Sequence, residues 1–258
     1  MPSSNVAWDI IDSVGILTFT RPHARNALTW DMYEALDRAC AAAGTSAGLR
    51  ALIIRGSGGS FAAGTDIAQF AGFASGADGV AYERRLDRMI DTLERVRVPT
   101  IAEVDGVAAG GGCLIALACD IRVCSPRAKF GIPVARTLGN CLSMANTVRL
   151  LDLVGPARPP ACLSASGRAG APEALALGFA TRIVDGDALS THVSALAAEL
   201  ASRAPSTVIA TKAMLARLRE FRTPPEGSAD DIIAACYGSD HFREGVAAFN
   251  EGRPPKWR

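Results

Sequence analysis

The chain has 258 residues, the length of one large domain or of a core domain with an appended region. Its 27 Lys and Arg balance 26 Asp and Glu to a net charge of +1, which favours neither nucleic acid nor an anionic membrane as a partner. Apolar residues make up 49% and charged residues 21%, a composition typical of globular and not of disordered proteins. A small molecule is therefore the expected ligand.

The sequence disfavours both a membrane-spanning segment and a metal site. Apolar stretches such as residues 107–118 are too short and too rich in glycine to cross ~30 Å of hydrocarbon, which needs about 20 residues. The first 12 residues lack the basic start and apolar run of a secretory signal. Seven cysteines without a CxxC pair, and three scattered histidines, predict free thiols, no metal site and a cytoplasmic location.

The first part of the chain alternates between strand and helix patterns. Alternating apolar and polar residues at 8–12 and 15–20 predict a hairpin. Helical spacing at 30–43 predicts a helix that stops at the following glycine. Apolar runs at 49–55 and 99–104 predict buried strands, and an amphipathic helix at 82–96 lies between them. This order indicates a parallel sheet wrapped by helices.

The second part becomes helical toward its end. The segment 108–118 is apolar all round and predicts a buried helix, followed by a strand at 120–125 and a helix at 145–154. Further helices are predicted at 189–203, 206–221, 229–237 and 240–250. We therefore predict a core over residues 1–200 and a helical C-terminal region over residues 201–258.

Two glycine-rich turns follow two of the predicted strands, at 61–66 (FAAGTD) and 106–112 (GVAAGGG). Glycine permits close approach and unusual backbone conformations, so it leaves backbone N–H groups accessible. The second turn runs into the buried helix, whose positive dipole end favours an anion. The alternative is that both are ordinary tight turns. A phosphate cradle is the weaker competitor, because neither GxGxxG nor GxxxxGK[ST] occurs.

Six short motifs occur in a fixed order along the chain. They are RP with RNAL (21–22 and 25–28), FAAGTD (61–66), G with GGGC (106 and 110–113), ACDIR (118–122), AKFG (128–131) and EGVAAF (244–249). In this order they resemble the enoyl-CoA hydratase/isomerase, or crotonase, superfamily over nearly the whole chain. The resemblance implies an α/β fold, with a crotonase-like spiral of ββα units and a helical C-terminal trimerisation region. It also implies a coenzyme A thioester as substrate, no other cofactor, and a homotrimer or dimer of trimers.

The resemblance also implies positions for the site. Two backbone amides form an oxyanion hole in the family, and they match Thr65 and Gly111 here. Such preorganised donors stabilise the negative charge of an enolate-like transition state by about 3 kcal/mol each. Because the donors are backbone groups, Thr in place of the frequent Ala is expected to be harmless. Ala63, Asp66 and Ile67 are then expected to line the path of the coenzyme. Arg25 is expected to meet its phosphates, or else to be a solvated surface charge.

The sequence departs from the family at two positions that matter for the reaction. Hydration in the family uses two glutamates, and the matching positions hold Leu114 and Val134. Adding water to an enoyl thioester needs one group that takes a proton and one that supplies a proton. Neither aliphatic side chain does either. Hydration by the two-carboxylate route is therefore not expected, and single-base isomerisation at the second position fails for the same reason.

Polar residues between 135 and 143 are the candidates for the remaining wall of the site. Arg136 is expected either to bind a substrate carboxylate or to pair across a subunit interface. Asn140 either orients water or a substrate oxygen, or caps the next helix. Cys141 either transfers a proton or is a small buried hydrophobe. Ser143 is a further polar group on this wall.

Two acidic residues outside that wall are also candidate bases. Asp66 is one, with local backbone bonding as the alternative. Glu103, on a buried strand, is either a displaced base or an ion-pair partner of Arg122.

These residues together predict an acyl-CoA enzyme of this superfamily, a lyase or an isomerase, whose reaction stays open. One hypothesis is decarboxylation or C–C cleavage, in which the apolar Leu114 and Val134 destabilise a substrate carboxylate. Another is isomerisation with Asp66, Glu103 or Cys141 as the base. The remaining alternatives are a thioester hydrolase that uses water held by Asn140, and a non-catalytic acyl-CoA binding protein.

Overall fold

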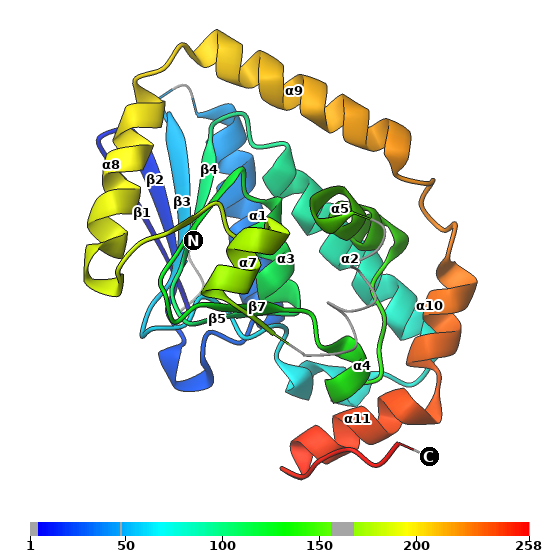
Figure 1. The fold of residues 1–258 in the computed structure, drawn as a ribbon. Coiled ribbons are helices and arrows are strands. Elements are labelled where there is room, and N and C mark those ends of the chain that lie inside the picture. Colours follow the sequence, from blue (N-terminus) through cyan, green and yellow to red (C-terminus); the bar gives the residue numbers. More distant parts are fainter. Residues whose placement is uncertain (1–4, 47, 156–167, 258) are drawn as a thin grey trace.

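The computed structural model describes residues 5–46, 48–155 and 168–257, and its centre is a six-stranded sheet (Figure 1). The strand order is β1-β2-β3-β4-β6-β9. These strands are β1 (Val6–Ile11), β2 (Val14–Phe19), β3 (Ala51–Gly56), β4 (Thr100–Val104), β6 (Ile121–Cys124) and β9 (Arg182–Ile183). The first pair is antiparallel and all later pairs are parallel. The predicted hairpin and buried parallel strands are thus confirmed.

A second, three-stranded sheet has the order β5-β7-β8. It consists of β5 (Val107–Ala109), β7 (Lys129–Gly131) and β8 (Ala169–Gly170). The expectation of one helix over residues 108–118 was therefore wrong at its start. Helix α3 begins only at Gly111, because Gly110 has φ 50° and interrupts the chain between strand and helix.

The core helices lie between the two sheets and the C-terminal region (Figure 1). They are α1 (Trp30–Thr45), α2 (Gly76–Glu94), α3 (Gly111–Ala118), α4 (Val134–Thr137), α5 (Met144–Val154) and α7 (Ala171–Leu177). Short 3-10 helices cover Pro22–Ala24, Ile67–Gly72 and Gly186–Ala188. Helix α1 continues through the predicted stop at Gly44. Helix α2 begins at Gly76 and not at residue 82, because Ser75 and Asp78 form a capping box.

The four predicted C-terminal helices are confirmed (Figure 1). They are α8 (Leu189–Ala201), α9 (Pro205–Arg222), α10 (Asp230–Tyr237) and α11 (Asp240–Asn250). Helix α8 covers one face of the large sheet, with Val193 and Ala197 buried there. Helix α10 packs on α2, and α11 packs on the 3-10 helix Ile67–Gly72. The division between residues 1–200 and 201–258 stays a prediction.

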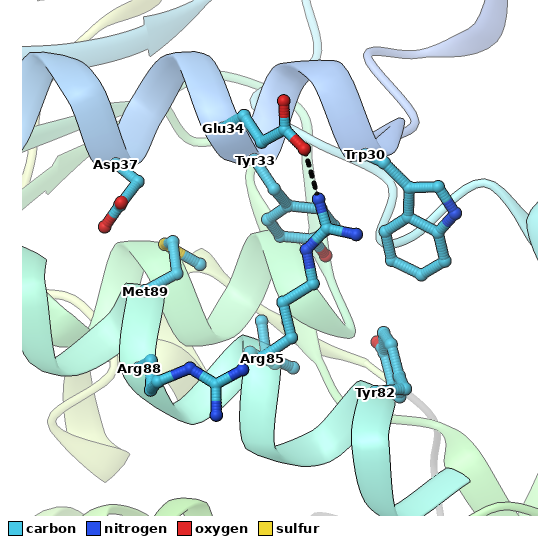
Figure 2. Close-up of a pocket in the computed structure, with 9 residues that line it drawn as sticks. Trp30, Tyr33, Glu34, Asp37, Tyr82, Arg85, Arg88 and Met89 are labelled. Carbon is cyan, nitrogen blue, oxygen red and sulfur yellow. Dashed lines mark hydrogen bonds and ion pairs between the residues drawn. The ribbon is translucent and has the colours of Figure 1, made fainter. Parts of the chain in front are cut away.

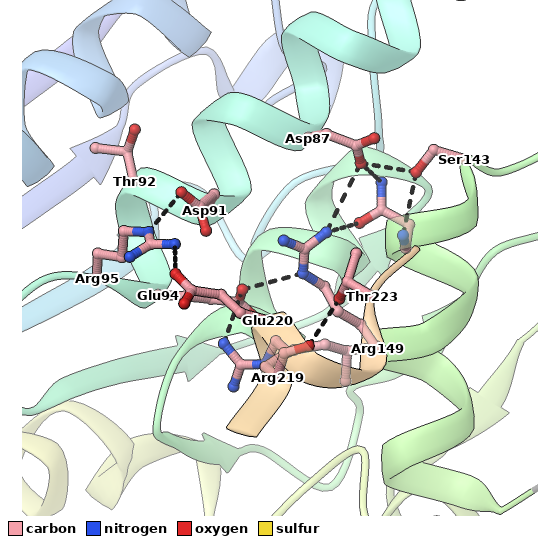
Figure 3. A network of polar contacts seen from close by, with 12 residues as sticks. Asp87, Asp91, Thr92, Glu94, Arg95, Ser143, Arg149, Arg219, Glu220 and Thr223 are labelled. Atoms are coloured by element: carbon pink, nitrogen blue, oxygen red, sulfur yellow. Dashed lines mark hydrogen bonds and ion pairs between the residues drawn. The ribbon is translucent and has the colours of Figure 1, made fainter. Parts of the chain in front are cut away.

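Ion pairs connect α2 to α5 and to α9 (Figure 3). Glu94, near the end of α2, accepts from Arg149 at 3.1 Å and from Arg219 at 2.8 Å. The Glu94 side chain is 6% exposed, so removing either arginine leaves a buried charge less well compensated. Across the described ranges, no helix is both long and apolar enough to cross a membrane.

Candidate active site

A cavity of about 280 Å³ lies where the two glycine-rich turns meet α2 and the loop that includes α4. Residues 63–67 line one side and residues 109–111 line the side next to it. Tyr82 and Glu83 of α2 contribute to the wall, and Phe249 of α11 contributes from the C-terminal region. The predicted ligand-path residues Arg25, Ala63, Asp66 and Ile67 all line this cavity. Their contact with a coenzyme stays a prediction.

The two turns run side by side in parallel. The Ala62 N–H donates to Val107 O at 3.0 Å, and the Ala109 N–H donates to Ala62 O at 2.9 Å. Immediately after these bonds, Thr65 and Gly111 both line the cavity. Within the part of the chain that the structure describes, neither the Thr65 N–H nor the Gly111 N–H has an acceptor. The structure thus brings two predicted amides together with their donor capacity unused.

A cluster of three hydroxyls supports this wall from behind. The Thr65 hydroxyl is 2.7 Å from the Tyr33 hydroxyl and 2.8 Å from the Tyr82 hydroxyl. Figure 2 shows that these tyrosines come from α1 and α2, where they also line a smaller cavity of about 130 Å³. Burial raises the pKa of both tyrosines well above the usual value, so both stay neutral.

Gly111 packs so closely against this hydroxyl cluster that only glycine fits at the position. A Cβ atom built on Gly111 would lie 2.2 Å from the Tyr33 hydroxyl, so no side chain fits there without a shift. The Tyr33 ring is 5% exposed, and its hydroxyl is bonded to Thr65, so it is not free to move aside. Threonine at position 65 was expected only to be harmless. Its hydroxyl in fact holds the Tyr33 hydroxyl, which in turn lies against Gly111, so this side chain helps to fix both amide-bearing residues.

The side chains next to the amides are apolar. Leu114, on the first turns of α3, and Val134, the first residue of α4, line the same cavity. Leu114 is 3% exposed. Ile132, Leu138 and Leu142 add to this apolar wall. The two positions at which the family has glutamates thus face the site without any titratable group.

Two carboxyl side chains line the cavity among the described residues, Asp66 and Glu83. Asp66 forms an ion pair with Arg21 at 2.6 Å and accepts the Ala68 N–H, so local bonding is confirmed for it. Glu83 is 2% exposed and accepts from the Tyr237 hydroxyl at 2.5 Å and from the Ser143 N–H at 3.1 Å. Burial raises the pKa of Glu83 to about 8. Sequence reasoning missed Glu83.

Asn140 lies in the cavity wall and reaches Glu83 indirectly. Its Nδ2 donates to the Tyr237 hydroxyl at 3.1 Å, and that hydroxyl donates to Glu83. Its Oδ1 is buried and has no partner in the described part of the chain. The alternative that Asn140 caps the next helix was wrong, because Ser143 caps α5 by accepting the Asn146 N–H.

Three arginines lie at or near the cavity. Arg25 and Arg168 line it, whereas the exposed Arg136 does not. Burial lowers the pKa of Arg168, and the charges of Arg136 and Arg25 lower it further, so the three lie near one another. In the ranges that the structure describes, none of the three forms an ion pair with a carboxylate.

Three further sequence candidates lie outside the cavity lining: Ser143, Cys141 and Glu103. Cys141 is hydrogen-bonded to Cys236, and this bond together with burial raises the pKa of Cys141, which keeps its thiol protonated. Glu103 accepts from the Ser190 hydroxyl at 2.5 Å and lies 4.0 Å from Arg55. The alternative that Glu103 pairs with Arg122 was wrong, because the Arg122 guanidinium donates to the carbonyls of Leu117 and Cys119 instead.

Known proteins resemble this chain over almost its whole length. Residues 9–258 match the sequence family described as enoyl-CoA hydratase/isomerase. A crotonyl-CoA hydratase of Syntrophomonas wolfei is 31% identical over 98% of this chain and 97% of its own. A probable enoyl-CoA hydratase of Bacillus subtilis is 31% identical over 95% of each chain. The crystal structure of an enoyl-CoA hydratase/isomerase from Xanthobacter autotrophicus Py2 superposes with a TM-score of 0.87 at 28% identity, covering 96% of this chain and 94% of that one. The free amides, the cavity and these matches lead to one conclusion: the chain belongs to the enoyl-CoA hydratase/isomerase family.

Proposed function

We propose that this protein is an acyl-CoA enzyme that binds the thioester carbonyl at the N–H groups of Thr65 and Gly111 and stabilises its enolate. The observation that carries this proposal is the pair of adjacent amides on the wall of one cavity, for which the described residues offer no acceptor. Donors fixed by the fold need no reorganisation when negative charge develops on the thioester oxygen. Gly111 also begins α3, whose dipole adds positive potential at that point.

The shape and charge of the cavity support a coenzyme A thioester. Its apolar wall, which includes Leu114, Val134 and Leu142, suits an acyl chain. No carboxylate of the described residues pairs with Arg25, Arg136 or Arg168, so their positive charge favours an anionic group such as a phosphate at this side of the cavity. The relatives named above are hydratases of enoyl-CoA compounds by their names, which supports the same substrate class.

The reaction differs from two-carboxylate hydration. Leu114 and Val134 lie beside the amides and hold no proton to give or take. This apolar wall favours a second candidate, the decarboxylation of an acyl-CoA that carries a carboxylate next to the thioester. The C–C bond then breaks, CO2 leaves, and the electron pair remains as the enolate bound by the two amides.

The proposed function is tested with a panel of acyl thioesters that includes crotonyl-CoA, malonyl-type thioesters and saturated acyl-CoAs. Products are identified by mass spectrometry, and binding is followed as thermal stabilisation. We expect stabilisation by acyl-CoA and turnover of at least one thioester, with crotonyl-CoA hydration slow or absent. Hydration of crotonyl-CoA at an ordinary enzyme rate of about 1 to 1000 per second would contradict our interpretation of Leu114 and Val134. Stabilisation without any product indicates a binding protein.

A further inference from the structure

Glu83 is placed in the cavity by the packing of two helices that are distant in the sequence. It belongs to α2 and is covered by α10. Close approach is possible because α2 has glycines on that side: a Cβ on Gly79 would lie 2.2 Å from the Tyr237 ring. Tyr237 therefore reaches Glu83 with its hydroxyl. The preceding residue, Tyr82, is hydrogen-bonded to Thr65, so Glu83 lies next to the amide-bearing wall.

No cation neutralises Glu83 among the residues that the structure describes. Two other carboxylates of the same helix, Asp87 and Glu94, do have an arginine beside them (Figure 3). The Asp87 carboxylate, one turn after Glu83, lies 3.7 Å from the Arg149 guanidinium, and the Glu94 carboxylate lies 3.1 Å from the same guanidinium. A buried carboxyl without a cation is unfavourable as an ion, so it exchanges its proton near neutral pH. The charge of Asp87 adds to the effect of burial on the pKa of Glu83.

A series of hydrogen bonds connects Glu83 through Tyr237 to Asn140. Asn140 Nδ2 donates to the Tyr237 hydroxyl, which donates to Glu83 Oε1. The buried Asn140 Oδ1 has no partner among the residues that the structure describes, although it belongs to a residue of the cavity wall. A buried acceptor of this kind is unfavourable unless a donor fills the place. This oxygen is therefore available to accept a hydrogen bond from a polar group of a ligand bound in the cavity.

We infer that Glu83 is the catalytic acid–base residue of this site, taking over on α2 the proton transfer that Leu114 and Val134 cannot perform. This inference rests on the proposed function. The Glu83 carboxylate removes a proton from the carbon next to the thioester carbonyl, and the C–H electron pair forms the enolate. The two amides bind the oxygen, and the new carboxylic acid returns a proton to carbon. Tyr237 and Asn140 are positioning residues for this carboxyl.

The experiment measures hydrogen exchange at the carbon next to the carbonyl. Saturated acyl-CoAs of increasing length, from acetyl-CoA to octanoyl-CoA, are incubated with the protein in D2O, and deuterium uptake is followed by mass spectrometry. A saturated acyl-CoA has no double bond to hydrate and no carboxylate to lose, so neither reaction contributes to the measured deuterium uptake. We expect exchange with the natural protein and a fall of about 100-fold or more for Glu83→Gln, since acid–base groups contribute about 10²–10⁴-fold. Thermal stabilisation by the same acyl-CoA should be retained.

The matched control is Glu103→Gln, a second buried carboxyl that lies outside the cavity lining. This variant should catalyse deuterium exchange of the acyl-CoA at the rate of the natural protein. Exchange by Glu83→Gln at the natural rate would overturn the inference, as would binding of acyl-CoA by the natural protein without any exchange. Absence of both binding and exchange across the whole series would instead overturn the proposed function.

Discussion

At the scale of single residues, the protonation of Glu83 links the site to the stability of the fold. Burial raises the pKa of this carboxyl from its ordinary 4.5 to about 8. The groups that face it are Asp87, Tyr33, Tyr82, Tyr237, Cys236 and the Ser143 N–H. A raised pKa in the folded state gives stability that is fully present below the ordinary value and is lost as the pH rises to the folded value. At neutral pH the folded protein therefore holds a proton that the unfolded chain has released.

We predict that Glu83→Gln changes the slope of stability with pH. Between the ordinary pKa of 4.5 and about 8, this one group makes the natural protein lose about 1.4 kcal/mol of unfolding free energy per pH unit. The amide has no such titration, so the stability of the variant relative to the natural protein should increase with pH. Urea unfolding of both proteins at several pH values in this range measures the difference. Two parallel stability curves would show that Glu83 has an ordinary pKa.

At the scale of elements, the start of α3 depends on contact with α1. We predict that Gly111→Ala lowers the unfolding free energy by about 1–3 kcal/mol, the usual effect of overpacking. The cause is the Tyr33 hydroxyl, 2.2 Å from the position of the new methyl group. Adding Tyr33→Phe removes that oxygen, so the double variant should be more stable than the sum of the single effects indicates. Urea unfolding of the four proteins measures this coupling. Simple additivity would mean that the methyl group meets another obstacle.

The elements show which parts of the fold the sequence predicts. Helices and strands with clear apolar spacing were predicted, because their burial pattern is local. The three-residue strand β5 was missed because its small residues continue into α3 without a change of pattern. The start of α2, from Gly76 to residue 81, was also missed. Its glycines are typical of a loop, and they are needed for close contact with α10, which lies far along the chain.

The site divides in the same way. Thr65 and Gly111 were predicted because they lie inside glycine-rich motifs that form backbone turns. Leu114 and Val134 were predicted because they follow closely on two recognisable motifs. Glu83 was missed because it precedes Arg84 and Arg85 and is therefore typical of a solvated surface. One local signal was available: Glu83 has helical spacing to Leu86 and Ile90, both buried. The hydrogen bond from Tyr237 depends on how α10 packs, which no local pattern indicates.

At the scale of the whole molecule, helix α9 lies along the outside of the fold (Figure 1). It carries an apolar face that the described residues leave uncovered. None of its residues is buried, and Phe221 is 91% exposed. Met214, Leu215 and Leu218 are also exposed and lie on the same side by helical spacing. By contrast, Phe242 and Val246 of α11 are buried within the chain. An exposed apolar face of this kind is typical of a protein–protein contact.

The homotrimer or dimer of trimers implied by the family resemblance is therefore best tested at α9. We predict that Leu218→Glu with Phe221→Glu lowers the assembled mass, because charges placed in an apolar contact lose hydration without gaining partners. Sedimentation velocity of the purified protein measures that mass. Ile10→Glu is the control: Ile10 is 59% exposed on β1, and its replacement should leave the mass unchanged. A monomeric natural protein would contradict the predicted assembly, whereas an unaltered oligomer of the double variant would place the contact on another surface.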